Sequence, residues 1–191
     1  MSYEEYIRDL LNRRVKSWQD RAAYINAKWG PKRLGVDNPG NRADRAFLEE
    51  YAVGLGVDIC CGDFLLGDES IGVDIRRTVL GADYHYSGDD LAFSKTNELD
   101  YVLTNYIEAM PNVIKALNEW FRALRAGGTM AIVCRNADVY PGPEGALKNR
   151  HRVHTFSKVT LSHYLGRVGF EDINIKETEH QTLHVTAKKP T

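Results

Sequence analysis

The chain has 191 residues, 43% of them hydrophobic and 27% charged, which is enough to bury the core of a single globular domain. Its 25 Lys and Arg residues nearly balance 26 Asp and Glu residues, so no large field of one sign is available to attract nucleic acid or an anionic membrane. The apolar runs are too short for a membrane span, and the opening "MSYEEYIRDL" carries acidic residues where a secretory signal has its apolar core. We therefore expect a cytoplasmic protein.

Helical patterns dominate the first 55 residues. Apolar residues recur at helical spacing, with charged residues between them, from about Ser2 to Ala27. The stretch 29–41 contains glycines and prolines and is predicted to be a loop. "ADRAFLEEYAV" then resumes helical spacing through Phe47, Leu48 and Tyr51. Residues 1–55 are therefore expected to form a helical N-terminal extension.

From Gly56 onward, strand and helix patterns alternate. Apolar strand runs are "GVDIC", "SIGVDI", "LDYVLTN" and "GGTMAIVCR", and helical runs are "NVIKALNEWFRALR" and "SKVTLSHYLGRVG". This alternation predicts an α/β domain over residues 56–191, with a Rossmann-like, doubly wound, mostly parallel sheet. The last two runs, "EDINIKE" and "TLHVTAKK", alternate apolar with polar residues and predict an antiparallel C-terminal hairpin.

The stretch "VDICCGDFLLGDESIGVDI", residues 57–75, is the first place to look for a ligand site. Open α/β sheets bind ligands beyond the carboxyl ends of their strands. Gly62 would let the backbone approach a ligand closely, and Asp74 closes the second strand, where a carboxylate can accept both hydroxyls of a ribose. A GxGxxG pattern is missing from this stretch, so an NAD site is not favoured.

Cysteine usage does not indicate a metal site. Cys60 and Cys61 are adjacent and Cys134 stands alone, so no CxxC pair is present for zinc. Small buried residues at strand ends are the expected role of all three.

Together with "LDYVLTNYIEAMPNVIKALNEWFRALRAGGTMAIVCRN" and "HTFSKVTLSHYLGRVGFEDI", this stretch resembles the class I S-adenosylmethionine (SAM)-dependent methyltransferases. The likeness is to the methyltransferase type 11-like branch with a short first loop, and it runs from about Gly56 to Pro190. It implies S-adenosyl-L-methionine as cofactor and transfer of a methyl group as activity. The cofactor-binding residues that it implies are Asp58, Cys60, Cys61, Gly62, Asp74, Ile75 and Asn105.

Within that set the resemblance assigns individual roles. Asp74 corresponds to the ribose-binding acid, Ile75 to a side chain against the adenine ring, and Asn105 to the backbone near the sulfonium end. An acid that reads the adenine amine is expected among Asp83, Asp89 and Asp90, and the alignment does not choose between them.

Candidate catalytic residues are those able to take a proton from an oxygen or nitrogen acceptor. His151 and His154 lie in the polar loop 141–157 after a strand, and Tyr106 follows the strand "LDYVLT". The near-neutral charge favours a small-molecule or sugar-like acceptor over nucleic acid. In this fold, additions such as residues 1–55 lie above the strand ends, so the extension is expected to form a lid over the acceptor.

Two alternatives remain open. Cys60 and Phe64 stand where the family usually has glycine, so the chain could be a catalytically degenerate methyltransferase fold that serves as a binding or structural module. The other is a different nucleotide-linked α/β enzyme, if Asp74 does not face a ribose.

Overall fold

The structure is a computed structural model, and it describes residues 39–63, 65–67, 70–77, 79, 81–139 and 152–191. Ala43–Thr191 form one compact unit. The predicted helix from Ser2 to Ala27, most of the predicted loop 29–41, Phe64 and His151 lie outside the described residues.

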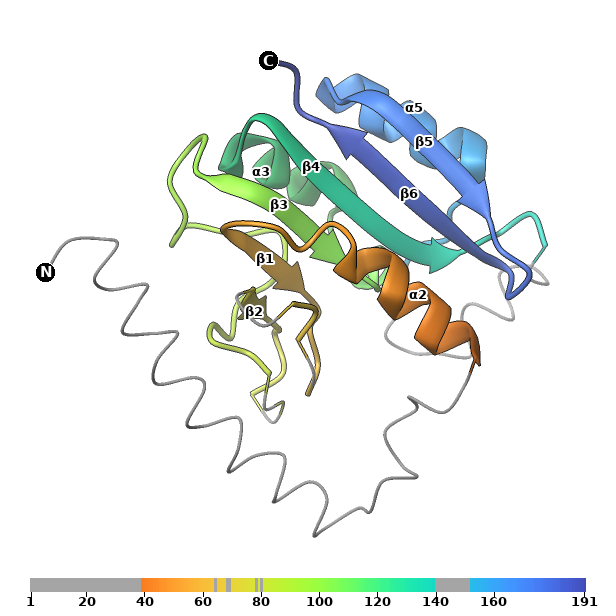
Figure 1. The fold of residues 1–191 in the computed structure, drawn as a ribbon, viewed down its shortest axis with the longest axis horizontal. Coiled ribbons are helices and arrows are strands. Elements are labelled where there is room, and N and C mark those ends of the chain that lie inside the picture. The colour runs from red at the N-terminus through yellow and green to blue at the C-terminus, as the bar shows by residue number, and fades with distance from the viewer. Residues whose placement is uncertain (1–38, 64, 68–69, 78, 80, 140–151) are drawn as a thin grey trace, which may run out of the picture. The chain divides into compact units, whose positions relative to one another are not determined.

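One mixed six-stranded sheet organises the molecule (Figure 1). The strands are β1 (Gly56–Ile59), β2 (Ile71–Val73), β3 (Leu99–Thr104), β4 (Leu124–Arg135), β5 (Glu171–Glu177) and β6 (Thr182–Lys188). Their order is β2-β1-β3-β4-β6-β5, with β2, β1, β3 and β4 parallel and β6 antiparallel to both β4 and β5. The predicted mostly parallel sheet with an antiparallel C-terminal hairpin is thus confirmed.

Helices lie on both faces of the sheet (Figure 1). Helix α2 (Pro39–Glu49) lies in front of it in this view, and α3 (Val113–Ala123) and α5 (Lys158–Val168) lie behind. Leu48 of α2 is fully buried in one core cluster with residues of β3 and β4. That cluster consists of Leu48, Leu66, Tyr101, Leu103, Ala131 and Val133. Trp120 of α3 is buried, and its indole Nε1 donates to the carbonyl of Gly88 at 2.6 Å.

Two predicted helix boundaries differ from the structure. Helix α2 begins at Pro39, inside the predicted loop 29–41, which is compatible with the tolerance of a first helical turn for proline. Helix α3 ends at Ala123 instead of continuing to Arg125. Leu124 adopts an extended conformation and pairs with Leu99, so sheet pairing takes over from the helical pattern there.

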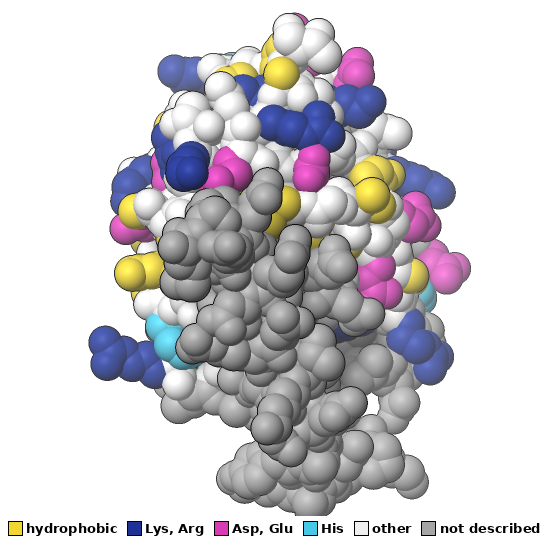
Figure 2. Space-filling model, turned by 60° about the vertical axis from the view of Figure 1, so that its left-hand side comes forward, with side chains coloured by type: hydrophobic (Ala, Val, Ile, Leu, Met, Phe, Trp, Pro, Cys, Tyr) yellow, Lys and Arg dark blue, Asp and Glu magenta, His cyan; other side chains and the backbone are white. Residues whose placement is uncertain are grey.

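Surface charge is mixed in sign on the described part of the face in Figure 2, where Lys and Arg side chains alternate with Asp and Glu side chains. This agrees with the formal net charge of −1. None of the helices among the described residues is long and apolar enough to span a membrane.

Candidate functional site

The turn that follows β1 has an unusual backbone. Cys60 has a φ of 60° and Gly62 a φ of 63°, so both adopt the left-handed conformation that glycine takes freely and other residues take with strain. The N–H of Cys60 donates to the carbonyl of Val73 at 2.8 Å, which ties the turn to the end of β2. The left-handed φ at position 60 gives a physical reason for a glycine preference there.

Asp74 lies directly after β2 and beside this turn. Its carboxylate Oδ2 accepts from the N–H of Gly62 at 3.1 Å. Arg76 donates to it three times: its backbone N and its Nε to Oδ1, at 2.9 and 3.0 Å, and its Nη2 to Oδ2 at 2.8 Å. Burial alone would raise the pKa of Asp74, but the hydrogen bonds and charge of Arg76 outweigh it, and the pKa lies below its ordinary value.

The remaining residues of the predicted cofactor set occupy different environments. Asp58 is buried and its Oδ2 accepts from the N–H of Leu66 at 2.8 Å, so it holds the chain after the turn. Ile75 is 65% exposed beyond β2, and Asn105 is exposed beyond β3. Because β1, β2 and β3 are parallel, the structure brings the turn, Asp74, Ile75 and Asn105 to the same edge of the sheet.

The two cysteines of the turn are poor nucleophiles. Burial, with the negative charges of Asp74 and Asp58, raises the pKa of Cys60 to about 12. Burial also raises the pKa of Cys61 well above its ordinary value. Both thiols therefore stay protonated near neutral pH. Among the described residues, no group of His, Cys, Asp and Glu is arranged to hold a metal ion.

The three acids considered for adenine recognition have different partners. Asp83 Oδ2 accepts from the N–H of Gly72 at 2.8 Å, and Asp90 Oδ1 accepts from the N–H of Ala92 at 3.1 Å. Asp89 is buried and faces Lys115, whose Nζ is 3.4 Å from Oδ2. The carboxylates of Asp83 and Asp90 thus accept hydrogen bonds from backbone N–H groups, whereas the carboxylate of Asp89 pairs with the Lys115 side chain.

A second polar group is built around Glu108, in the short 3-10 helix η2 (Ile107–Ala109) after β3. Its side chain is buried, and Oε1 accepts from the N–H of Arg135 at the end of β4, at 2.9 Å. Its carbonyl accepts from the N–H groups of Val153 and His154, at 2.9 and 3.1 Å. Burial raises the pKa of Glu108 above its ordinary value.

Glu108 is one of four described residues with a buried polar side-chain atom that lacks a hydrogen-bond partner. Within the part of the chain that the structure describes, these atoms are Glu108 Oε2, Asn136 Nδ2, Arg152 Nε and His154 Nε2. Arg152 Nε is 3.8 Å from Glu108 Oε1, too far for a hydrogen bond. Each unmet buried polar group typically costs about 1–3 kcal/mol, and such groups are rare in folded proteins. We call Glu108, Asn136, Arg152 and His154 the polar cluster.

Tyr106, which follows β3, contacts Arg152 of the polar cluster. The Arg152 guanidinium lies over the Tyr106 ring, 5.3 Å from its centroid. Burial raises the pKa of Tyr106, so its phenol remains a hydrogen-bond donor near neutral pH. The contact of the guanidinium with the ring places Arg152 of the polar cluster beside Tyr106, the second residue after β3.

Arg76, Arg152 and Asn136 were not among the residues singled out from the sequence. A basic residue two positions after a strand-ending acid is a local signal that could have indicated Arg76. No local signal was available for Arg152 and Asn136, because their surroundings come from segments distant in the chain.

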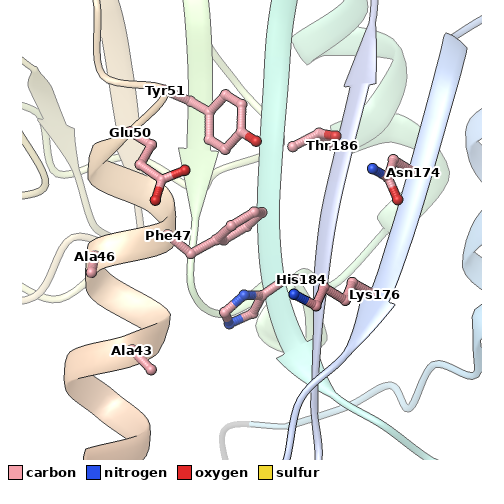
Figure 3. Close-up of a pocket in the computed structure, with 9 residues that line it drawn as sticks. All are labelled: Ala43, Ala46, Phe47, Glu50, Tyr51, Asn174, Lys176, His184 and Thr186. Carbon is pink, nitrogen blue, oxygen red and sulfur yellow. The ribbon is translucent and has the colours of Figure 1, made fainter.

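A separate hollow lies between α2 and the hairpin of β5 and β6 (Figure 3). Its volume is about 390 Å³. The ring of His184 stacks on Phe47 with a centroid distance of 4.2 Å, as Figure 3 shows. His184 Nε2 is 2.8 Å from Asp44 Oδ1, which also accepts from the Thr182 hydroxyl at 2.8 Å. Asp44 thereby joins α2 to β6.

Comparison with known proteins gives matches in structure only. No protein-family model matches the chain, and no curated protein matches its sequence. A SAM-dependent methyltransferase from Archaeoglobus fulgidus is 16% identical, with 87% of this chain and 98% of that chain covered and a TM-score of 0.67. One from Thermotoga maritima is 19% identical, with coverages of 81% and 96% and a TM-score of 0.61.

A third solved structure, Haemonchus contortus phosphoethanolamine N-methyltransferase 2 in complex with S-adenosyl-L-methionine, is 13% identical to this chain. It is matched over 78% of this chain and 53% of its own, with a TM-score of 0.60. The chain therefore has the fold of the class I SAM-dependent methyltransferases, as the sequence resemblance predicts.

Proposed function

We propose that this protein is a SAM-dependent methyltransferase that acts on a small-molecule acceptor. The observation that carries the proposal is the placement of the Asp74 carboxylate beside the Gly62 turn, at the carboxyl edge of this fold. A carboxylate held there can accept both hydroxyls of a ribose. The solved structures of the same fold, one of them bound to SAM, support the choice of cofactor.

We assign the residues at this edge to different parts of SAM. Asp74 would hold the ribose, and the exposed apolar side chain of Ile75 would lie against the adenine ring. Asp89 is the best of the three acids for the adenine amine, because Asp83 and Asp90 already hold backbone N–H groups. Asn105 would lie near the sulfonium end, beyond β3.

SAM supplies a methyl group that its sulfonium already activates for in-line displacement. The protein therefore acts mainly by holding the acceptor atom in line and excluding water. An acceptor hydroxyl or amine must also lose a proton as the new bond to carbon forms, which requires a nearby base.

The polar cluster is our proposed acceptor site. Its unpartnered atoms include donors, Arg152 Nε and Asn136 Nδ2, and an acceptor, Glu108 Oε2. An acceptor hydroxyl, as in a sugar-like molecule, can accept from the donors and donate to Glu108. Glu108 and His154 are the proposed bases, because each has a buried side-chain atom without a hydrogen-bond partner and burial raises the pKa of Glu108 above its ordinary value.

Three predictions about the acceptor side remain. Tyr106, with its raised pKa, would orient the acceptor as a donor more readily than it would remove a proton. His151 stays a candidate base, and residues 1–55 stay a candidate lid.

A catalytically degenerate fold that serves as a binding module is the second candidate. The specific observation in its favour is that the Arg76 guanidinium already occupies the Asp74 carboxylate and lies beside Gly62, in a turn where a cysteine at position 60 takes a left-handed φ. A module of this kind would bind neither SAM nor its product tightly.

Calorimetric titration with SAM and with S-adenosylhomocysteine distinguishes these candidates. Wild-type protein is expected to bind both, and Asp74→Asn is expected to lose most of the affinity because the amide cannot accept both ribose hydroxyls. Asp172→Asn, at a largely exposed acid on β5, is the matched control and should bind like wild type. Absence of heat with millimolar ligand in wild-type protein would refute the cofactor and favour the module.

A further inference from the structure

Arg76 fills the position that the proposed function assigns to the ribose. An ionised carboxylate offers about four lone-pair sites. At Asp74 these are taken by the backbone N–H groups of Gly62 and Arg76 and by Nε and Nη2 of the Arg76 side chain. A ribose diol needs one acceptor position on each oxygen, and those two positions are the ones that the guanidinium occupies.

The same guanidinium also lies over the turn. A Cβ atom placed on Gly62 would be 3.6 Å from Arg76 Nη2, and among the described residues, chain neighbours aside, it would meet no other atom within 4 Å. The guanidinium is therefore the group that stands where a ligand would approach the Gly62 backbone. The Arg76 side chain thus covers both the Asp74 carboxylate and the Gly62 turn, which are the two features expected to bind the cofactor.

Arg76 and Asp74 differ in their freedom to move. The Asp74 side chain is 3% exposed, whereas that of Arg76 is 54% exposed. The backbone of Arg76 is held separately, because its carbonyl is 3.1 Å from His85 Nδ1 and its N–H donates to Asp74. The guanidinium can therefore swing into solvent while the backbone and the carboxylate stay in place.

From this geometry we infer that Arg76 is an internal competitor of the cofactor. It satisfies the buried Asp74 carboxylate in the free protein and leaves when the ribose hydroxyls of SAM take its place. This inference rests on the proposed function. Its consequence is that Arg76 weakens SAM binding by occupying the Asp74 carboxylate.

Arg77 provides a matched control. It is the next residue, it is exposed, and it carries the same charge. Its replacement removes one positive charge near the site, so it reports the general repulsion of a cationic ligand. In the hydrogen bonds described above, it is Arg76 and not Arg77 that donates from two guanidinium nitrogens to the Asp74 carboxylate.

Calorimetric titration of SAM into wild type, Arg76→Ala, Arg76→Lys and Arg77→Ala tests the inference, after circular dichroism has established that each variant is folded. Arg76→Ala is expected to bind SAM roughly two- to fivefold tighter than wild type, the range of a partly exposed ion pair. Arg76→Lys should lie between them, because an ammonium cannot form the two-point fork. Arg77→Ala should bind like wild type, and the gain from Arg76→Ala should shrink at high salt.

The outcomes separate the two proposals. If Arg76→Ala binds no tighter than Arg77→Ala, Arg76 is not a competitor, and the proposed function stands. If none of the four proteins binds SAM, both proposals fail. A direct readout is the Nε–H resonance of Arg76, identified by its loss in Arg76→Lys, which must shift when SAM binds to wild type. An unchanged resonance at saturating SAM would overturn the inference even if the affinities agreed with it.

Discussion

Replacing Cys60 with glycine is expected to leave the protein at least as stable as wild type. Cys60 has a φ of 60°, a conformation that costs a residue with a Cβ about 1–2 kcal/mol. Glycine removes that strain, but its greater freedom in the unfolded chain costs about 0.5–1 kcal/mol. The two effects give a net stabilisation of about 0.5 kcal/mol for Cys60→Gly, from which the loss of a partly buried thiol subtracts a few tenths.

Cys61→Gly provides the comparison, because the neighbouring residue has the same side chain without the left-handed φ. Cys61 is 9% exposed, so its replacement loses the contacts of a buried side chain as well as gaining the flexibility of glycine. Together these effects are expected to destabilise the protein by about 1.5–2 kcal/mol. The two glycine variants should therefore differ by about 2 kcal/mol, although each removes one cysteine.

Thermal unfolding followed by circular dichroism under reducing conditions measures this difference. A change of 1 kcal/mol shifts the Tm of a chain of this size by about 2–4 °C, so Cys60→Gly should melt roughly 4–8 °C above Cys61→Gly. The same samples can be titrated with SAM, because glycine at position 60 also removes a side chain from the turn after β1, where we propose that the cofactor binds. Equal destabilisation by the two replacements would refute the strain at Cys60.

Two further predictions concern groups outside the turn that follows β1. The raised pKa of Glu108 means that the folded protein holds its proton more tightly than the unfolded chain, so this stabilising contribution is present below the unfolded pKa and disappears as the pH rises through the folded pKa. In urea unfolding, Glu108→Gln should therefore lose less stability than wild type as the pH rises above about 4.5. Equal losses in the two proteins would contradict a buried carboxyl at position 108. Asp44→Ala removes the acceptor shared by Thr182 and His184 and should destabilise the protein by about 2–3 kcal/mol. The control is Asp172→Asn, at an exposed site. If Asp44→Ala destabilises the protein no more than this control does, Asp44 does not anchor α2.

Local sequence patterns were sufficient for much of the fold. The runs "GVDIC" and "SIGVDI" predicted buried strands, and the structure contains them as β1 and β2. Alternating residues near the C-terminus predicted the hairpin of β5 and β6. Helix α5 begins at Lys158 after the N-cap residue Ser157, whose side chain forms a capping box with Thr160, and this signal lies in neighbouring residues. These features depend on interactions that are local or repeat with a fixed period, so a single sequence contains them.

The partners of the site residues were decided by the tertiary structure. The sequence could place Asp74 at a strand end. It could not predict that the Arg76 guanidinium binds the Asp74 carboxylate, because that contact depends on the directions of both side chains after the strand. Glu108 meets Arg135 and His154 only because β3, β4 and the segment from residue 152 converge at one edge. Asp44 and His184 are 140 positions apart. Hydrogen bonds of this kind depend on packing between distant segments, and short-range periodicity does not encode which segments will meet.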